Sequence, residues 1–213
     1  MHVEKLSLGP LGTNCYIVSR NGNCLIFDPS GESQVIIDYV EKNQLTPKAI
    51  LLTHAHFDHI GALNDVRKRY DLDVYLHKNE QDWLENPALN RSIVFFGEEH
   101  AIYAARPDYL LEVGQLTIAD FDMEVIHTPG HSPGSVTFIF AEENFIISGD
   151  VLFPMGVGRT DLPEGSMEEL AKSIATKLYE LPDDFTVYPG HNVATTIGHE
   201  KRHNPYTLQF YPV

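Results

Sequence analysis

The sequence predicts an α/β fold, because short apolar runs rich in β-branched and aromatic residues alternate with segments of helical periodicity. In the first half, strand-like runs lead directly into helical patterns. The second half resumes with more strand-like runs, which one long helical segment interrupts. At 213 residues with 43% hydrophobic content, the chain is long enough for one well-buried domain and short for two. We therefore expect a single domain.

The first half contains four strand-like runs and three helical patterns. The predicted strands are Asn14–Val18, Cys24–Phe27, Ala49–Leu52 and Val74–Leu76. The predicted helices are Ser33–Asn43, Ala62–Tyr70 and Lys78–Leu84. Between residues 87 and 107 aromatic residues are scattered among polar ones. This segment is interpreted either as a loop or short helix over a site, or as a peripheral helix whose aromatic residues face the core.

The second half predicts five strands and one helix. The strands are Gln115–Ile118, Met123–Ile126, Val136–Phe140, Phe145–Ile147 and Thr186–Tyr188. The helix covers about Met167–Leu181; Ser166 and Glu169 form a capping box at its start, and Pro182 ends it. Each half thus combines a β-meander with helices, which is consistent with two sheets packed face to face and helices outside.

The charge of the chain argues against binding to nucleic acid. Thirty acidic residues against fifteen basic ones give a formal charge of −15, which opposes association with a polyanion. The densest basic run, Arg67-Lys68-Arg69, is typical of an exposed helix face, since only Tyr70 adds an aromatic ring to it.

The cysteines and the N-terminus predict a cytoplasmic protein. Cys15 and Cys24 flank a probable strand and turn, so buried packing in a reducing compartment is more natural than a disulfide framework. The segment Met1–Lys5 lacks the layout of a signal peptide, and no apolar run approaches membrane-spanning length. We expect neither a membrane nor a nucleic acid as partner, and the sequence does not indicate an oligomeric state.

A histidine-rich segment follows the predicted strand Ala49–Leu52. It places His54, His56, Asp58 and His59 within six positions. Neutral imidazoles and an ionised carboxylate are ligands for zinc and for divalent iron or manganese, and a loop at a strand end can direct alternate side chains to one point. A solvated loop or an accidental cluster is the alternative.

Three later residues repeat the same arrangement and favour the metal site. His131 lies in His127-Thr128-Pro129-Gly130-His131, Asp150 follows Phe145–Gly149, and His191 follows Val187–Gly190. In each case a short apolar run and a Gly or Pro turn precede a potential ligand. A solvated loop needs no such matching ligands downstream.

Some neighbouring residues have simpler explanations than catalysis. His127 is interpreted as a packed or turn histidine, with a hydrogen bond to a metal ligand as the alternative. Ser132 and Ser135 are expected to take part in capping or turn chemistry, because no base accompanies them. The remaining histidines are assigned surface or capping roles: His2, His77, His100, His199 and His203.

The ordered HxHxDH motif and its downstream His, Asp and His resemble the metallo-β-lactamase superfamily, and within it the short glyoxalase II-like (hydroxyacylglutathione hydrolase-like) thioester hydrolases. The resemblance covers nearly the whole chain, from Gly12–Tyr16 to Thr195–Gly198. It implies an αββα sandwich of two mixed β-sheets with helices on the outer faces. It also implies one domain over residues 1–213, without the C-terminal helical domain of full-length glyoxalase II.

The resemblance implies a ligand set for two divalent ions. His54, His56 and His131 are assigned to one ion. Asp58, His59 and His191 are assigned to the second, and Asp150 bridges both. Seven protein ligands leave coordination positions open, as catalysis requires and a structural zinc site does not. Zinc is the expected metal, and iron or manganese also suit these ligands.

The expected reaction is hydrolysis of a thioester such as hydroxyacylglutathione, a small-molecule substrate, by a metal-bridging hydroxide. Asp58 is the expected catalytic residue, because besides binding metal it would orient that hydroxide. A leaving thiolate needs no obligatory acid, since free thiols have a pKa near ~8.5. An aspartate at position 150 favours this chemistry over β-lactam hydrolysis, where a cysteine often serves the second metal.

Arg159, in the loop Gly156–Asp161, is a candidate for binding a substrate carboxylate, although an Arg159–Asp161 pair that pins the loop is favoured. The nearest alternative function is that of a persulfide dioxygenase-like mononuclear iron enzyme, which shares most of these ligands. A nuclease or lactonase on the same fold and a non-catalytic metal-binding module are further alternatives.

Overall fold

The computed structural model describes residues 1–208, which form two six-stranded mixed sheets with helices and one two-stranded hairpin. The chain divides into two compact units. Unit 1 comprises Met1–Leu111 and Thr117–Phe121, and unit 2 comprises Glu112–Leu116 and the described part of Asp122–Val213. Each unit is described by itself.

The first sheet has the strand order β1-β2-β3-β4-β5-β6. Its strands are β1 His2–Leu8, β2 Thr13–Arg20, β3 Asn23–Phe27, β4 Thr46–Leu51, β5 Val74–His77 and β6 Tyr109–Leu111. The helices of this unit are α1 Ser33–Lys42, η1 Phe57–His59, α2 Leu63–Tyr70, η2 Lys78–Trp83, α3 Ser92–Phe96 and η3 Glu98–His100. The first three strands are antiparallel, whereas β3 to β6 run parallel.

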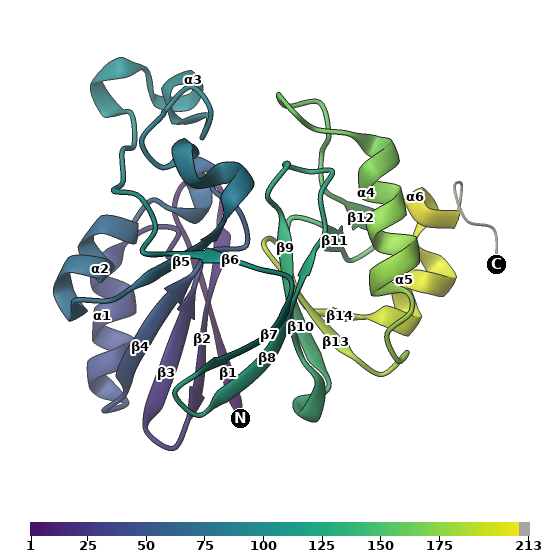
Figure 1. Ribbon diagram of the computed structural model, residues 1–213, viewed down its shortest axis with the longest axis horizontal. Coiled ribbons are helices and arrows are strands. Elements are labelled where there is room, and N and C mark those ends of the chain that lie inside the picture. The colour runs from purple at the N-terminus through teal and green to yellow at the C-terminus, as the bar shows by residue number, and fades with distance from the viewer. Residues whose placement is uncertain (209–213) are drawn as a thin grey trace. The chain divides into compact units, whose positions relative to one another are not determined.

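Helices α1 and α2 cover one face of the first sheet (Figure 1). Ile36 and Val40 of α1 and Leu63 and Val66 of α2 are fully buried in a core with the side chains of the strands. Their spacing of three or four residues puts each pair on one side of its helix. Parallel neighbouring strands need crossover connections, and α1 provides one between β3 and β4, and α2 one between β4 and β5.

The second sheet has the order β14-β13-β10-β9-β8-β7. Its strands are β7 Gly114–Ile118, β8 Phe121–His127, β9 Val136–Phe140, β10 Phe145–Gly149, β13 Thr186–Pro189 and β14 Thr195–Thr196. The strands β11 Leu152–Phe153 and β12 Gly156–Val157 form the separate hairpin. The helices are η4 Ala141–Glu143, α4 Met167–Ser173, α5 Ile197–His203 and α6 Pro205–Leu208, and α4 continues into a π-turn, Ile174–Leu178.

The second sheet carries its helices on one face (Figure 1). Leu170 of α4, Leu178 of the π-turn and Ile197 of α5 are fully buried against Ile146 and Val187 of the strands. As predicted, Ser166 caps α4, since its Oγ accepts a hydrogen bond from the Glu169 amide at 3.3 Å. Among residues 1–208, no helix is long and apolar enough to span a bilayer.

The structure corrects the predicted elements in several places, and it contains β11, β12, β14, α5 and α6, which the sequence did not predict. The predicted helix Lys78–Leu84 is a 3₁₀ helix, η2, that ends one residue earlier, at Trp83. The predicted helix Met167–Leu181 is shorter, because the α-helix proper ends at Ser173 and the π-turn ends at Leu178. The edge strands β1 and β6 were not predicted, because exposed and partly buried residues obscure a strand pattern at the edge of a sheet.

The segment from 87 to 107 contains the short helices α3 and η3, so the interpretation as a loop or short helix is the correct one. Phe95 and Tyr103 are about half exposed, at 49% and 57%, and therefore do not face a core. Instead, the aromatic rings of Phe95 and Phe96 pack near the ring of Phe57, the first residue of η1. Their ring centroids lie 4.5 and 5.3 Å, respectively, from the centroid of Phe57.

Candidate metal centre

Unit 1 brings together the four predicted ligands of the histidine-rich segment. This segment follows β4, whose last three residues are buried, and ends in η1. The four side chains are 0 to 7% exposed. Metal-binding atoms lie within 4.8 Å of one another in three of their pairs: His54 and His56, His54 and His59, and Asp58 and His59. Burying four such groups together is costly unless charge is compensated, which is what a divalent ion provides.

Asp28 orients two of these histidines. It follows β3, the parallel neighbour of β4, and its amide donates to the Leu51 carbonyl at 3.1 Å. Its buried carboxylate accepts hydrogen bonds from the Thr53 amide at 2.8 Å, the Thr53 hydroxyl at 2.7 Å and Nδ1 of His59 at 2.9 Å. Because a carboxylate only accepts, Nδ1 of His59 carries the proton and Nε2 carries the lone pair.

The same carboxylate acts on His54 through Thr53. The Thr53 hydroxyl gives its proton to Asp28, so it can only accept from Nδ1 of His54, which lies 3.1 Å away. Nε2 of His54 is then the nitrogen with the lone pair. One buried carboxylate thus sets the tautomer of a ligand assigned to each of the two ions. Such outer partners fix the orientation of metal-binding histidines and raise their basicity.

Two further side chains hold the histidine-rich segment in place. The Thr13 hydroxyl donates to Oδ2 of Asp58 at 2.8 Å. Glu80, fully buried in η2, accepts a hydrogen bond of 2.6 Å from the amide of Ala55, the residue between the first two histidines. The backbone that carries His54 and His56 is therefore fixed by a charge-assisted bond from a distant part of the chain.

In unit 2, His131 lies in a loop held against α4. The Pro129 carbonyl accepts from Ser173 Oγ at 2.8 Å, and the Gly130 carbonyl accepts from the Ser166 amide at 2.7 Å. A Cβ on Gly130 would lie 2.2 Å from the Leu170 amide nitrogen, so only glycine permits this approach. Nδ1 of His131 donates to the Arg159 carbonyl at 2.8 Å, which leaves its Nε2 with the lone pair.

Asp150 and His191 come together because their strands are parallel neighbours. Asp150 directly follows β10, and His191 follows β13, with Gly149 in register with Pro189. Oδ2 of Asp150 lies 3.5 Å from Nε2 of His191 and 3.6 Å from Nε2 of His131. Within unit 2, one carboxylate oxygen is thus close to two imidazole nitrogens, and the bridging role of Asp150 stays a prediction.

Arg159 is paired with Asp161, as the sequence favoured. Nε and one terminal nitrogen of Arg159 each donate to a different oxygen of Asp161 at 2.7 Å. This pair lowers the pKa of Asp161 to about 2, chiefly through the hydrogen bond from Arg159. Both side chains are more than half exposed. A substrate-binding role for Arg159 stays a prediction.

The simpler roles assigned to nearby residues agree with the structure. Nε2 of His127 donates to the Pro133 carbonyl at 2.8 Å, which is a turn contact. Ser132 and Ser135 bond to each other at 2.7 Å within the same turn. Cys15 and Cys24 are fully buried free thiols, and burial raises the pKa of Cys24 to about 12.

Sequence reasoning missed Asp28, Thr13 and Glu80 as site residues. Asp28 had a recognisable signal, because it follows the apolar strand Cys24–Phe27 just as Asp150 follows Phe145–Gly149. Glu80 had none, since nothing in its local sequence indicates that the folded chain places its carboxylate at the Ala55 amide.

These residues fit divalent metal ions. The observed hydrogen bonds leave Nε2 as the coordinating nitrogen in His54, His59 and His131, and carboxylates are close to the histidines in both units. Imidazole nitrogen and carboxylate oxygen suit zinc, iron and manganese. The two units together contain the seven predicted ligands.

A family model described as the metallo-β-lactamase superfamily matches residues 8–191. A relative from Bacillus subtilis (strain 168), named "Probable metallo-hydrolase YqgX", is 46% identical over 99% of both chains. A relative from Haemophilus influenzae, named "Hydroxyacylglutathione hydrolase GloC", is 38% identical over 97% of this chain and 98% of its own.

Two solved structures are similar to the chain. One, titled as the BLEG-1 B3 metallo-beta-lactamase, is 46% identical, has a TM-score of 0.94 and is matched over 97% of this chain and 99% of its own. Another, TTHA1623 in a di-iron-bound form, is 37% identical with a TM-score of 0.83 over 95% of this chain and 99% of its own. The similarity to such structures, together with the two mixed sheets and their helices, confirms the predicted fold class.

Proposed function

Because the chain belongs to the metallo-β-lactamase superfamily, we propose that it is a dinuclear metal-dependent hydrolase of thioesters, with hydroxyacylglutathione as the first substrate to test. The observation that carries the proposal is the buried ligand cluster of unit 1, in which Asp28 directs both His54 and His59 toward metal binding. The hydroxyacylglutathione hydrolase among the relatives supports the choice of substrate.

In this proposal, the two units act as one catalytic domain. His54, His56 and His131 hold one ion. Asp58, His59 and His191 hold the other, and Asp150 is shared. Two bound divalent ions would supply Lewis-acid chemistry that makes water a nucleophile near neutral pH. The cytoplasmic setting and zinc as the native metal stay predictions, and the di-iron form of a similar structure makes iron a metal to measure as well.

The protein groups have defined roles in this reaction. The Thr13 hydroxyl holds Oδ2 of Asp58, which fixes the direction in which this carboxylate can orient an attacking water. Arg159 is proposed to contact a charged group of the substrate through the part of its guanidinium that Asp161 does not bind. The thiol product leaves as a thiolate, so the site needs no acid to protonate it.

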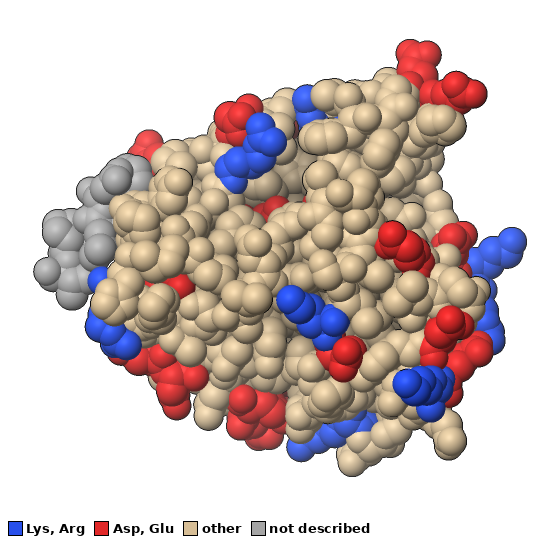
Figure 2. Space-filling model, turned by 180° about the vertical axis from the view of Figure 1, so that it is seen from behind, with Lys and Arg blue, Asp and Glu red and all other residues tan. Residues whose placement is uncertain are grey.

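The basic residues of unit 1 favour a small-molecule substrate over nucleic acid. Arg67 binds both oxygens of Asp108 at 2.8 Å, Arg69 pairs with Glu41 at 2.5 Å, and Arg106 pairs with two carboxylates. Figure 2 shows Lys and Arg side chains that are scattered among acidic ones over the face in view. Positive groups already paired in this way contribute little to binding a polyanion.

A substrate panel on metal-quantified protein tests the proposal. The panel contains lactoylglutathione, other acyl thioesters, a lactone, a β-lactam and a phosphodiester, with oxygen uptake measured on glutathione persulfide. We expect turnover of thioesters, two metal ions per chain, and loss of turnover in Asp150→Ala. Turnover of another substrate but of no thioester would overturn the proposal, as would oxygen uptake coupled to a single iron.

A further inference from the structure

Unit 1 contains a pocket of about 260 Å³ beside the predicted catalytic residue Asp58. Its walls are largely apolar, with Pro10, Phe57, Phe96 and Ile102 among the lining residues. Glu32, at the start of α1, adds a second carboxylate. Asp58 is itself one of the lining residues, so the pocket adjoins the predicted ligand cluster.

Close backbone packing fixes the polar side of this pocket. Glu32 accepts a hydrogen bond from the Gly9 amide at 2.5 Å. A Cβ on Gly31 would lie 2.7 Å from Gly9, and one on Gly61 would lie 2.2 Å from the Ser30 carbonyl oxygen. These glycines allow three chain segments to meet, so the part of the wall that Gly9, Gly31 and Gly61 form is closely packed backbone.

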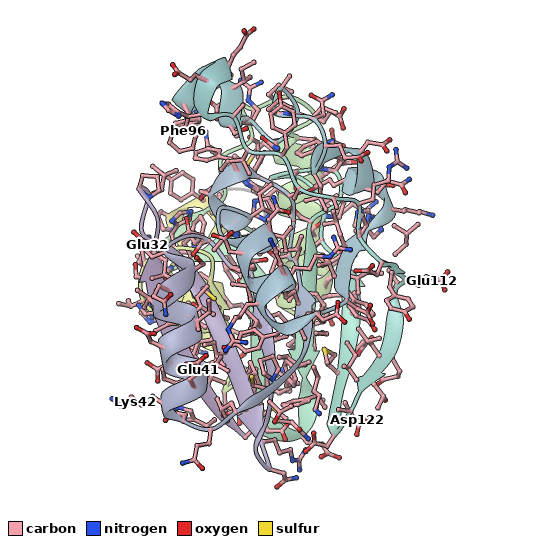
Figure 3. All side chains as sticks on the ribbon, turned by 90° about the vertical axis from the view of Figure 1, so that its left-hand side faces the viewer. Glu32, Glu41, Lys42, Phe96, Glu112 and Asp122 are labelled. Atoms are coloured by element: carbon pink, nitrogen blue, oxygen red, sulfur yellow. The ribbon has the colours of Figure 1, made fainter. Side chains whose placement is uncertain are left out.

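The opposite wall is aromatic. Phe96 packs edge-on against Phe57, with 5.3 Å between the ring centroids and 89° between the ring planes. Figure 3 shows Glu32 at the end of α1 that is nearer to Phe96, whereas Glu41 and Lys42 lie at the other end of the helix. An aromatic wall of this kind offers a large apolar contact area to a ligand.

The charge and size of the pocket restrict what it can bind. Among the lining residues that the structure describes, two are acidic and none is basic. An anionic group such as a glutathione carboxylate would meet like charge there and find no partner. Pockets for whole drug-sized ligands have volumes of roughly 300–1,000 Å³, so this one suits a fragment of a substrate.

We propose that this pocket binds the acyl group of the substrate and selects neutral, apolar acyl chains. The proposal rests on the proposed function, because Asp58 places the pocket next to the reacting carbonyl only if the site hydrolyses acyl compounds. The thiol portion of the substrate then lies outside the pocket. Specificity comes from the acyl side, through burial of its methylenes against Phe57, Phe96 and Ile102.

Two series of compounds test this inference. The first contains glutathione thioesters of acetyl, propionyl, butyryl and hexanoyl groups, for which kcat/KM is measured. The second contains ketone analogues of the same thioesters, with CH₂ in place of sulfur, whose Kd is measured by calorimetry without turnover. We expect each added methylene to improve kcat/KM and Kd about fourfold until the pocket is full.

Variants locate the effect in the pocket. Phe96→Ala should reduce the gain per methylene to less than about twofold in both series, because it removes one wall. Val94→Ala is the matched control, since Val94 lies in the same helix, is 60% exposed and does not line the pocket. Circular dichroism verifies that each variant is folded.

The outcomes separate this inference from the proposed function. If no thioester is hydrolysed but the analogues still bind with a chain-length dependence that Phe96→Ala removes, the pocket is supported and the proposed hydrolysis fails. If thioesters are hydrolysed and the chain-length dependence is the same in Phe96→Ala as in Val94→Ala, the pocket proposal fails. It also fails if thioesters are hydrolysed without any dependence on the length of the acyl chain. A preference for succinyl over butyryl would also overturn it.

Discussion

Replacing Asp28 by Asn tests whether one buried carboxylate organises the metal ligands of unit 1. The substitution keeps the shape of the side chain, and Asn tolerates the left-handed backbone at this position, where φ is 47°. The Asn oxygen must still accept from the Thr53 amide, so its NH₂ faces the Thr53 hydroxyl and Nδ1 of His59. Two of the three bonds to the carboxylate lose their acceptor.

The expected magnitudes follow from these contacts. Hydrogen bonds to a charged group contribute about 1.5–3 kcal/mol each, so the loss of two should lower the free energy of unfolding by about 3–6 kcal/mol. In addition, His59 can accept from the new NH₂ only if its proton moves to Nε2, which blocks the coordinating lone pair. Loss of such outer partners typically weakens metal binding 10- to 100-fold, and we expect a change of that size.

The assay combines chelator competition for metal affinity, urea unfolding of metal-free protein and ¹⁵N NMR of the histidine tautomers. Asp120→Asn is the matched control, because Asn21 and Asn23 each donate to its carboxylate at 3.0 Å on the surface of unit 1. Metal affinity and unfolding free energy equal to those of Asp120→Asn, with His59 still protonated at Nδ1, would refute the reasoning.

Three other predictions concern Asp58, the close backbone packing at Gly158 and the buried thiol of Cys24. Asp58→Ala should lower kcat at least about 100-fold while one of the two ions remains bound, measured by kinetics with metal analysis; loss of both ions would contradict the division of ligands. Gly158→Ala should destabilise the protein strongly, because the added Cβ would lie 1.9 Å from the Asp150 carbonyl oxygen. Gly156→Ala is the control, since its Cβ would meet only atoms at 3.7 Å or more. Equal melting temperatures of the two variants would be inconsistent with this packing. Burial raises the pKa of Cys24 from 9.0 to about 12, so the folded protein keeps a proton that the unfolded chain loses above pH 9. The contribution of the protonated thiol to the free energy of unfolding should therefore be fully present below pH 9 and should fall as the pH rises toward 12. Urea unfolding at several pH values should show a smaller fall in Cys24→Ala.

Much of the fold could be predicted because most strands and helices have local signals. Buried strands such as β9 consist mainly of apolar residues, and α4 begins after a side chain that caps it. The edge strands β1 and β6 were missed, because exposed and partly buried residues obscure the strand pattern in both; in addition, the partner of β6 lies more than 30 residues away in the sequence. The segment predicted as the helix Lys78–Leu84 forms a 3₁₀ helix over Lys78–Trp83. In so short a segment, the spacing of hydrophobic residues does not distinguish a 3₁₀ helix from an α-helix.

The sequence by itself determined the chemistry of the ligands. The histidine-rich segment indicates a metal site whatever its place in the fold, because coordination depends on the donor atoms that each side chain carries. Its donor residues are His54, His56, Asp58 and His59. Their position after a strand was also predictable, since the apolar run of β4 leads into them.

Only the tertiary structure decided which nitrogen carries the lone pair in His54, His59 and His131, and what lies beside the predicted ligands. The tautomers depend on Asp28 and on the Arg159 carbonyl, which are 31 and 28 residues away from the histidines they contact. The acyl pocket likewise joins segments as far apart as Pro10 and Ile102. Hydrogen bonds and shape complementarity act between neighbours in space, and a local sequence pattern records only neighbours along the chain.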